Sequence, residues 1–353
     1  MILIAARSPY QVVIDEPTQV ATKVEVYLWN KGTLPPTNPT YIMSEKIASI
    51  TQRETNYNIS PFILEKISQI QNDYSSDTVA VEDDSNWCFV RVMRYYSTDG
   101  VAFTLLTDKS YIGVNAYTLV EDGVNYDYCN DEVAILLAQK KITVQYQATR
   151  YYYNFMCERS ASLSYVVNYL KNNVIVNTQT FLTAGASETF NYKIPLAVNE
   201  SDTTEIKLGA TLIAKFQTEL ILECKYEPVV VSFVNRYGGW QPLMFFKASE
   251  NSIETKGTEY NLMPESWNYN YQIGQTKTMN INGSKMIKCN TGFVDEDYSE
   301  LITDLMMSDT ILVNFLPATV KSKSTVLKKH LKEKNINYTV EFEYSNNLLN
   351  NIV

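Results

Sequence analysis

The residues of this chain that could do chemistry are few and scattered. The only histidine among 353 residues, His330, lies in the lysine-rich run Leu327-Lys-Lys-His-Leu-Lys-Glu-Lys. Two acidic runs, 82–84 and 295–297, could offer oxygen ligands to calcium or magnesium, but neither has the D-x-[DN]-x-[DN]-G spacing of a calcium loop. The simpler interpretations are a solvated basic face for His330, a solvated loop for 82–84 and a helix N-terminus for 295–297.

Motifs of catalysis are missing from the sequence. It contains no Gly-rich phosphate loop, no GxSxG elbow and no HExxH, and only 12 glycines in all. A carboxylate pair for glycoside hydrolysis stays open, because its two members can be distant in the chain. We therefore expect no enzyme, with no catalytic residues, no metal and no cofactor.

The five cysteines indicate reduced, buried thiols. Their spacing gives no CxxC pair and their number is odd, so neither a compact zinc module nor a disulfide framework is expected. A thiol that does no chemistry packs as a small apolar side chain. The cysteines are Cys88, Cys129, Cys157, Cys224 and Cys289.

The most informative segment is Phe233-Val-Asn-Arg-Tyr-Gly-Gly-Trp240, which lies between the apolar runs 229–234 and 243–246. It predicts a hairpin whose turn uses residues that tolerate positive φ: Asn235, Gly238 and Gly239. A planar cation and two large rings, the residue types that anchor protein interfaces, would then lie at the tip: Arg236, Tyr237 and Trp240. The alternative interpretation is that these three residues pack within their own domain.

Positive charge is concentrated in 321–334, which includes Lys328 and Lys329. A solvated face is the simpler interpretation. A contact with an acidic surface of a neighbouring subunit is the alternative we favour for Lys328 and Lys329, and contact with a DNA backbone is a weaker one.

Hydrophobic periodicity predicts a mainly β chain. In the first third, a short helix is expected at 61–71 after Ser60, and strands at 19–29, 41–50, 87–96, 101–107 and 111–120. The middle third predicts strands at 141–155, 162–170, 174–180, 188–194, 205–214 and 219–226, with Asn172-Asn173 as a hairpin turn. The last third predicts strands at 277–289, 310–315 and 337–344 and a helix within 295–308.

Closely spaced strands favour antiparallel neighbours, so the fold class expected is two antiparallel β-sandwich domains plus a C-terminal α+β region. The expected domains are 1–132, a β-sandwich with one short helix; 133–228, a second β-sandwich; and 229–353, the α+β region with the Arg236–Gly239 hairpin. A chain this long is expected to hold two or three domains.

The composition limits the partners. Hydrophobic residues make up 45% and charged residues 20%, which favours full folding, and the 26 tyrosines suit both sheets and contact surfaces. The net charge of −9 argues against a basic nucleic-acid-binding surface, although an acidic channel wall could let DNA slide past. No run approaches the roughly 20 apolar residues that cross a bilayer, and the apolar N-terminal run is too short for a signal peptide, so membrane insertion is not expected.

Several segments resemble virion structural proteins of tailed phages of Bacteroidetes, including crAss-like phages. They are Ala6-Arg-Ser-Pro-Tyr10 with the strand to Trp29, Tyr57-Asn-Ile-Ser-Pro-Phe-Ile-Leu-Glu-Lys, the 233–240 hairpin and the region from Cys289-Asn-Thr-Gly-Phe to Glu343. The closing Tyr-Thr-Val-Glu-Phe-Glu strand is also similar to the end of distal-tail and ring-type proteins.

This resemblance implies a neck, tail-hub or portal-proximal ring subunit, located in the virion and assembled in the host cytoplasm. Its implied partners are about 6 or 12 copies of itself in a closed ring, other neck and tail proteins, and genomic DNA passing through the channel. The alternative is a receptor- or carbohydrate-binding protein at the tail tip. A polysaccharide-degrading enzyme is a third hypothesis, which would require the converging carboxylate pair.

Overall fold

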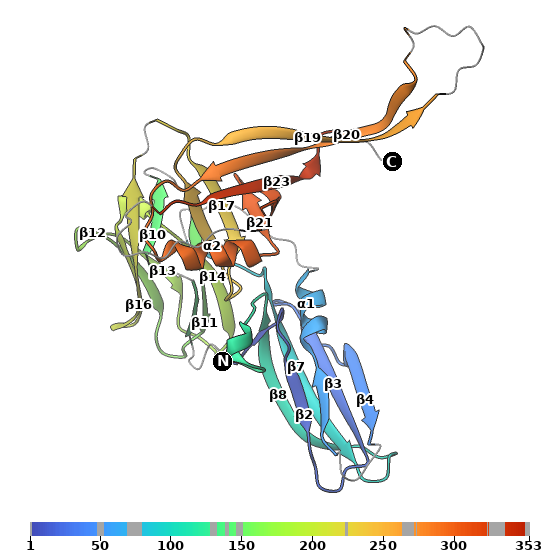
Figure 1. Ribbon diagram of the computed structural model, residues 1–353. Coiled ribbons are helices and arrows are strands. Elements are labelled where there is room, and N and C mark those ends of the chain that lie inside the picture. Colours follow the sequence, from blue (N-terminus) through green and yellow to red (C-terminus); the bar gives the residue numbers. More distant parts are fainter. Residues whose placement is uncertain are drawn as a thin grey trace. The chain divides into compact units, whose positions relative to one another are not determined.

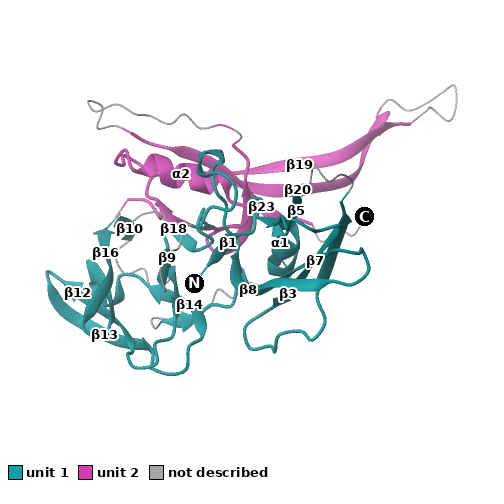
Figure 2. Ribbon diagram, turned by 90° about the horizontal axis from the view of Figure 1, so that it is seen from below, with its two compact units in different colours: residues 1–222, 234–242 teal, residues 223–233, 243–353 magenta. Residues whose placement is uncertain are grey.

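The computed structural model describes residues 2–47, 53–68, 80–127, 133–137, 141–145, 151–222, 225–262, 272, 274–322, 324 and 336–349. The chain forms two compact units (Figure 2). Unit 1 contains Met1–Leu222 and Val234–Pro242, and unit 2 contains Glu223–Phe233 and Leu243–Val353. The chain thus passes from one unit to the other three times, and the tip of the predicted 229–246 hairpin belongs to unit 1.

The predicted fold class is confirmed, because strands dominate both units (Figure 1). Unit 1 contains the sheets of both predicted β regions, and unit 2 contains most of the predicted C-terminal region. Over the ranges that the structure describes, no helix is long and apolar enough to cross a membrane.

The N-terminal sheet of unit 1 has five strands in the order β1-β8-β7-β3-β4. Its strands are β1 (Leu3–Ala5), β3 (Ala21–Trp29), β4 (Tyr41–Lys46), β7 (Trp87–Ser97) and β8 (Thr104–Val114). The strands β2 (Gln11–Ile14) and β5 (Thr55–Asn58) form a separate two-stranded sheet that shares a hydrophobic core with it. The alternation predicted for 19–29 is present, since Val24, Val26 and Leu28 are buried. Helix α1 (Ser60–Ser68) packs closely on β8, where an added Cβ at Gly113 would lie 2.2 Å from Ile63 Cγ2.

Two expectations for this region need correction. The predicted strands 101–107 and 111–120 are one continuous strand, β8, which pairs with β7 along almost its whole length. The polar residues between them, 108–110, are all exposed, and Asp108 pairs with Arg91 of β7. Strand β1 pairs with β8 in parallel, whereas hairpin neighbours predict antiparallel pairing.

The second part of unit 1 has a five-stranded sheet, β10-β16-β15-β12-β13, and a four-stranded sheet, β6-β14-β11-β9. Aromatic rings form the core between them, as Tyr153 of β11 contacts Phe216 of β16 at 4.5 Å between ring centroids. The strands are β6 (Val81–Glu82), β9 (Val133–Leu136), β10 (Lys141–Gln145), β11 (Tyr152–Glu158), β12 (Tyr165–Lys171), β13 (Val174–Leu182), β14 (Thr189–Pro195), β15 (Thr203–Leu208) and β16 (Thr211–Ile221). Single 3-10 turns occur at Val120–Asp122 and Val198–Glu200.

The predicted turn at Asn172-Asn173 is confirmed, because both residues have positive φ (51° and 64°) between β12 and β13. The single strand predicted for 141–155 is wrong, since β10 and β11 belong to different sheets. The strand predicted for 205–214 is also wrong. Gly209, with φ 58°, turns the chain there and separates β15 from β16, so the run expected at 219–226 begins as the end of β16.

Unit 2 is a seven-stranded sheet in the order β18-β17-β21-β22-β23-β20-β19 with helix α2 (Tyr298–Met307). Apolar side chains of the helix, among them Ile302 and Leu305, share a core with Phe233, Phe245 and Phe342 of the sheet. The strands are β17 (Val229–Val234), β18 (Trp240–Phe245), β19 (Glu250–Asn261), β20 (Thr276–Asn290), β21 (Ile311–Val313), β22 (Leu316–Val320) and β23 (Thr339–Asn347).

Candidate functional site

The tip of the 229–246 hairpin is fixed inside unit 1 by Asn235, which is fully buried. Its side-chain amide donates to the carbonyl of Leu136 at 3.1 Å, and its Oδ1 accepts from the main-chain N–H groups of Tyr237 (3.0 Å) and Gly239 (3.2 Å). Of the three residues chosen because they tolerate positive φ, Gly238 alone has it, at 83°. The loop is therefore shaped mainly by the asparagine side chain.

The aromatic and cationic residues of this tip contact their own unit. Trp240 is only 2% exposed. Arg236 pairs with Asp122 at 3.6 Å and lies over the ring of Tyr237, which packs on a cluster that includes Val114. The structure thus matches the alternative interpretation given from the sequence, in which these three residues pack within their own domain. A subunit contact through these three residues remains a prediction.

A buried polar network holds the Trp240 end of the hairpin tip. The main-chain N–H of Trp240 donates to Asn154 Oδ1 at 2.7 Å, and Asn154 Nδ2 donates to Asp83 Oδ2 at 2.7 Å. Lys193 Nζ lies 3.6 Å from Asp83 Oδ1. The solvated loop expected for 82–84 is therefore wrong at Asp83, which is 3% exposed, because the lysine and the asparagine compensate its buried charge.

Among the described residues, groups that could do redox or metal chemistry are buried or dispersed, and Cys129 and Cys224 lie outside those residues. Burial raises the pKa of the thiols of Cys88, Cys157 and Cys289 to about 12, so at neutral pH they are inert. Within the described ranges no three His, Cys, Asp or Glu side chains gather as a metal site. Lys328, Lys329 and the single histidine lie outside the described residues, so the expectations for them are not tested.

Strands β19 and β20 of unit 2 form a long two-stranded ribbon (Figure 1). Strand β23 pairs with β20 only from Ser284 to Asn290, so beyond Ser284 the ribbon has two strands. Apolar side chains on this outer part are exposed to solvent: Tyr260, Met279 and Ile281, at 42%, 48% and 47%. The ribbon thus presents apolar surface without a third strand or a covering helix among the described residues.

A groove of about 610 Å³ opens at the base of the ribbon. Its apolar lining comes from three strands and the end of a fourth: Ile253, Met286, Leu316 and Leu348. The register places Ile253 and Lys285 opposite each other, on the sheet face that carries the buried Ile287. The groove therefore lies on the same face of the sheet that packs against α2, but beyond the part that α2 covers.

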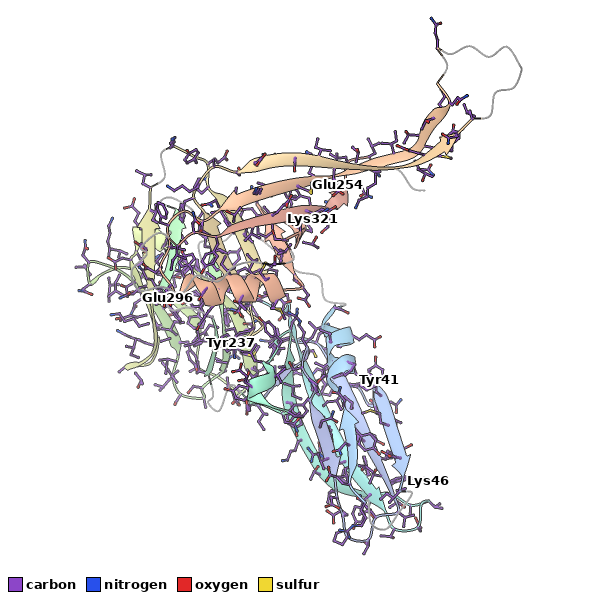
Figure 3. The ribbon with its side chains drawn as sticks, in the orientation of Figure 1. Tyr41, Lys46, Tyr237, Glu254, Glu296 and Lys321 are labelled. Carbon is purple, nitrogen blue, oxygen red and sulfur yellow. The ribbon has the colours of Figure 1, made fainter. Side chains whose placement is uncertain are left out.

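A charged network connects the strands behind this groove. Lys321 bonds both Glu254 and Glu343, the second at 3.0 Å, and Ser284 Oγ donates to Glu343 at 2.6 Å (Figure 3). These bonds raise the pKa of Lys321 and lower that of Glu343. The network ties β19, β20 and β23 together at the point where the three-stranded part ends.

Sequence reasoning missed half of the ribbon. The strand predicted at 277–289 is confirmed as β20, but β19 was not predicted, because almost all its side chains are exposed and show no apolar alternation. The available signal was weaker: the twelve residues Glu250–Asn261 contain no proline and carry polar residues on both faces, as edge strands do.

Comparisons with known proteins assign no family. No protein-family model matches the chain, no curated protein matches it, and no solved structure matches it.

Proposed function

We propose that this protein is a structural subunit of a tailed-phage virion that forms a homo-oligomeric ring in the neck or tail. The sequence segments that resemble phage virion proteins, and a mainly β fold, support the proposal. The observation that carries it is the β19–β20 ribbon. An isolated two-stranded hairpin is marginally stable in water, so a ribbon with exposed Met279 and Ile281 gains stability from a surface of another subunit.

Sheet augmentation is the mode of assembly that the topology favours. Strand β19 is an edge of the seven-stranded sheet, and its outer main-chain groups can pair with a strand of a neighbour. Glu250, Glu254 and Glu259 lie on this edge. Charges on an edge strand discourage pairing with chance partners, so they suit a strand that pairs with one specific surface.

The alternative, a tail-tip protein that binds a receptor or carbohydrate, is less well supported. Sugar binding by stacking uses aromatic side chains, and the groove in unit 2 has one, Tyr344, among the side chains that line it. With a single aromatic residue for stacking and apolar contacts from Ile253, Leu316 and Leu348, the groove suits a protein side chain better than a sugar.

Single-particle electron microscopy together with mass photometry of the purified protein tests the proposal. We expect closed rings for the wild type. The variant Met279→Asp/Ile281→Asp should lose them while its circular dichroism stays that of the wild type. The control Val120→Asp changes a residue that is 99% exposed in unit 1 and should assemble normally. A uniform monomer or a compact trimer of the wild type would contradict the ring and transfer support to receptor binding.

A further inference from the structure

Phe293 is an exposed aromatic residue held in a fixed position. Its side chain is 68% exposed in the connection between β20 and α2. The residues around it are hydrogen-bonded to one neighbouring segment: Thr291 N donates to Tyr338 O at 3.0 Å, and Val294 N to Ile336 O at 2.9 Å. The main chain is thus pinned on both sides of the phenylalanine, although nothing in the described chain covers most of the ring.

A pinned, exposed ring has the properties of an interface anchor. Large aromatic side chains bury much area in a contact, and a preorganised one loses little conformational entropy on binding. Three exposed acidic residues follow after Val294: Asp295, Glu296 and Asp297. We refer to residues 293–297 as the knob, an apolar ring with negative charge beside it.

The groove in unit 2 suits the knob in size and charge. Its apolar lining includes Ile253, Leu316 and Leu348, and Lys285 supplies the only charge among the described residues that line it. The other lining residues include an uncharged polar set: Asn251, Ser252, Asn346 and Asn347. A phenylalanine ring is small enough to enter a volume of about 610 Å³. The groove therefore offers apolar walls to Phe293 and one cation to an acidic neighbour such as Glu296.

One chain cannot bring its own knob to its own groove. From Lys285 to Asn290 strand β20 runs about 17 Å at 3.3 Å per residue, and Phe293 lies beyond that end. Figure 3 shows Glu296 at the start of α2, and Glu254 and Lys321 farther along the sheet of unit 2, toward the two-stranded part of the ribbon. Knob and groove are therefore separate surfaces, as a head-to-tail contact requires.

We infer that the knob of one copy docks in the groove of the next copy, with Phe293 between Ile253 and Leu316 and Glu296 facing Lys285. This inference rests on the proposed function, since it names the contact by which the subunits associate. Two different complementary patches on one chain make a heterologous interface. Such an interface generates a closed ring when the rotation between subunits closes, and a filament when it does not.

Sedimentation velocity of the full chain over a range of concentrations tests this contact. Phe293→Ala should weaken self-association roughly tenfold or more, the effect of removing an interface anchor. Because Phe293 is exposed, the variant should keep the far-ultraviolet circular dichroism and the urea midpoint of the wild type. The matched control, Leu34→Ala, removes a side chain that is 90% exposed in unit 1 and should associate like the wild type.

A charge exchange separates a direct contact from an indirect effect. Lys285→Glu and Glu296→Lys should each weaken association, and the double variant should recover much of it, because the pair would again have opposite signs. Wild-type assembly that Phe293→Ala leaves unchanged would overturn the inference and leave the ring proposal standing. A wild type that stays monomeric at every concentration would overturn both. Glycan binding that depends on Lys285 would assign the groove to a sugar and likewise overturn the inference.

Discussion

Replacing Gly239 by alanine tests how the hairpin tip is held in unit 1. A Cβ at this position would lie 2.2 Å from the carbonyl oxygen of Leu136 and 2.5 Å from Leu136 Cβ. Contacts this short do not occur between real atoms, so the main chain of the tip or of β9 must shift. The same Leu136 carbonyl accepts the hydrogen bond from buried Asn235, so the shift also disturbs that bond.

The two effects give the expected size of the change. Overpacking a well-packed site costs about 1–3 kcal/mol. Weakening a hydrogen bond between buried groups adds about 1 kcal/mol or more. We therefore expect Gly239→Ala to lower the free energy of unfolding of unit 1 by about 3 kcal/mol.

Urea unfolding followed by tryptophan fluorescence measures this change. Trp87 and Trp240 are buried in unit 1, so their emission reports on its transition. The control is Gly100→Ala, because Gly100 has φ 76° and an added Cβ there meets nothing within 4 Å. The control should lose about 1–2 kcal/mol, the cost of a left-handed backbone for an L-residue. Equal losses in the two variants would refute the steric argument.

Three further predictions concern unit 1. Asn154→Ala should lower its free energy of unfolding in urea by about 3 kcal/mol, because the buried N–H of Trp240 loses its acceptor. Burial raises the pKa of Cys88 and Cys157 from 9.0 to about 12, so folding favours the protonated thiols. Stability should be intact below pH 9 and fall above it by up to about 1.4 kcal/mol per pH unit for each thiol. Asn173→Ala should lower the free energy of unfolding in urea by about 1 kcal/mol, because φ is 64° at this position and alanine disfavours positive φ. Asn173→Gly should cause no such loss, since glycine adopts positive φ freely.

Each of these has a result that would contradict it. A stable Asn154→Ala protein would mean that water or another group satisfies the Trp240 amide. The thiol prediction fails if Cys88→Ala/Cys157→Ala shows the same loss of stability between pH 9 and 11 as the wild type. Equal midpoints for the alanine and glycine variants at Asn173 would show that the turn relaxes.

The sequence by itself determined the elements whose signals are local. The alternation of Val24, Val26 and Leu28 has the two-residue period of a half-buried strand, and it is found in β3. The apolar spacing around Ile302 predicted α2, and the paired asparagines at 172–173 predicted a hairpin turn, in which both have positive φ. In each case the cause is a side-chain periodicity or a backbone preference that acts within a few neighbouring residues, so the sequence alone is sufficient to reveal it.

Only the tertiary structure decided which strands share a sheet and which polar groups are buried. Asp83 looks solvated in sequence, yet Lys193 and Asn154, distant in the chain, provide the partners that allow its burial. Trp240 looks like an exposed anchor, yet it belongs to unit 1 while part of its own strand belongs to unit 2. Strand β19 shows no alternation because both its faces are exposed, so only its pairing with β20 defines it. Contacts between residues far apart in the chain set these outcomes, and such contacts leave no period in the sequence.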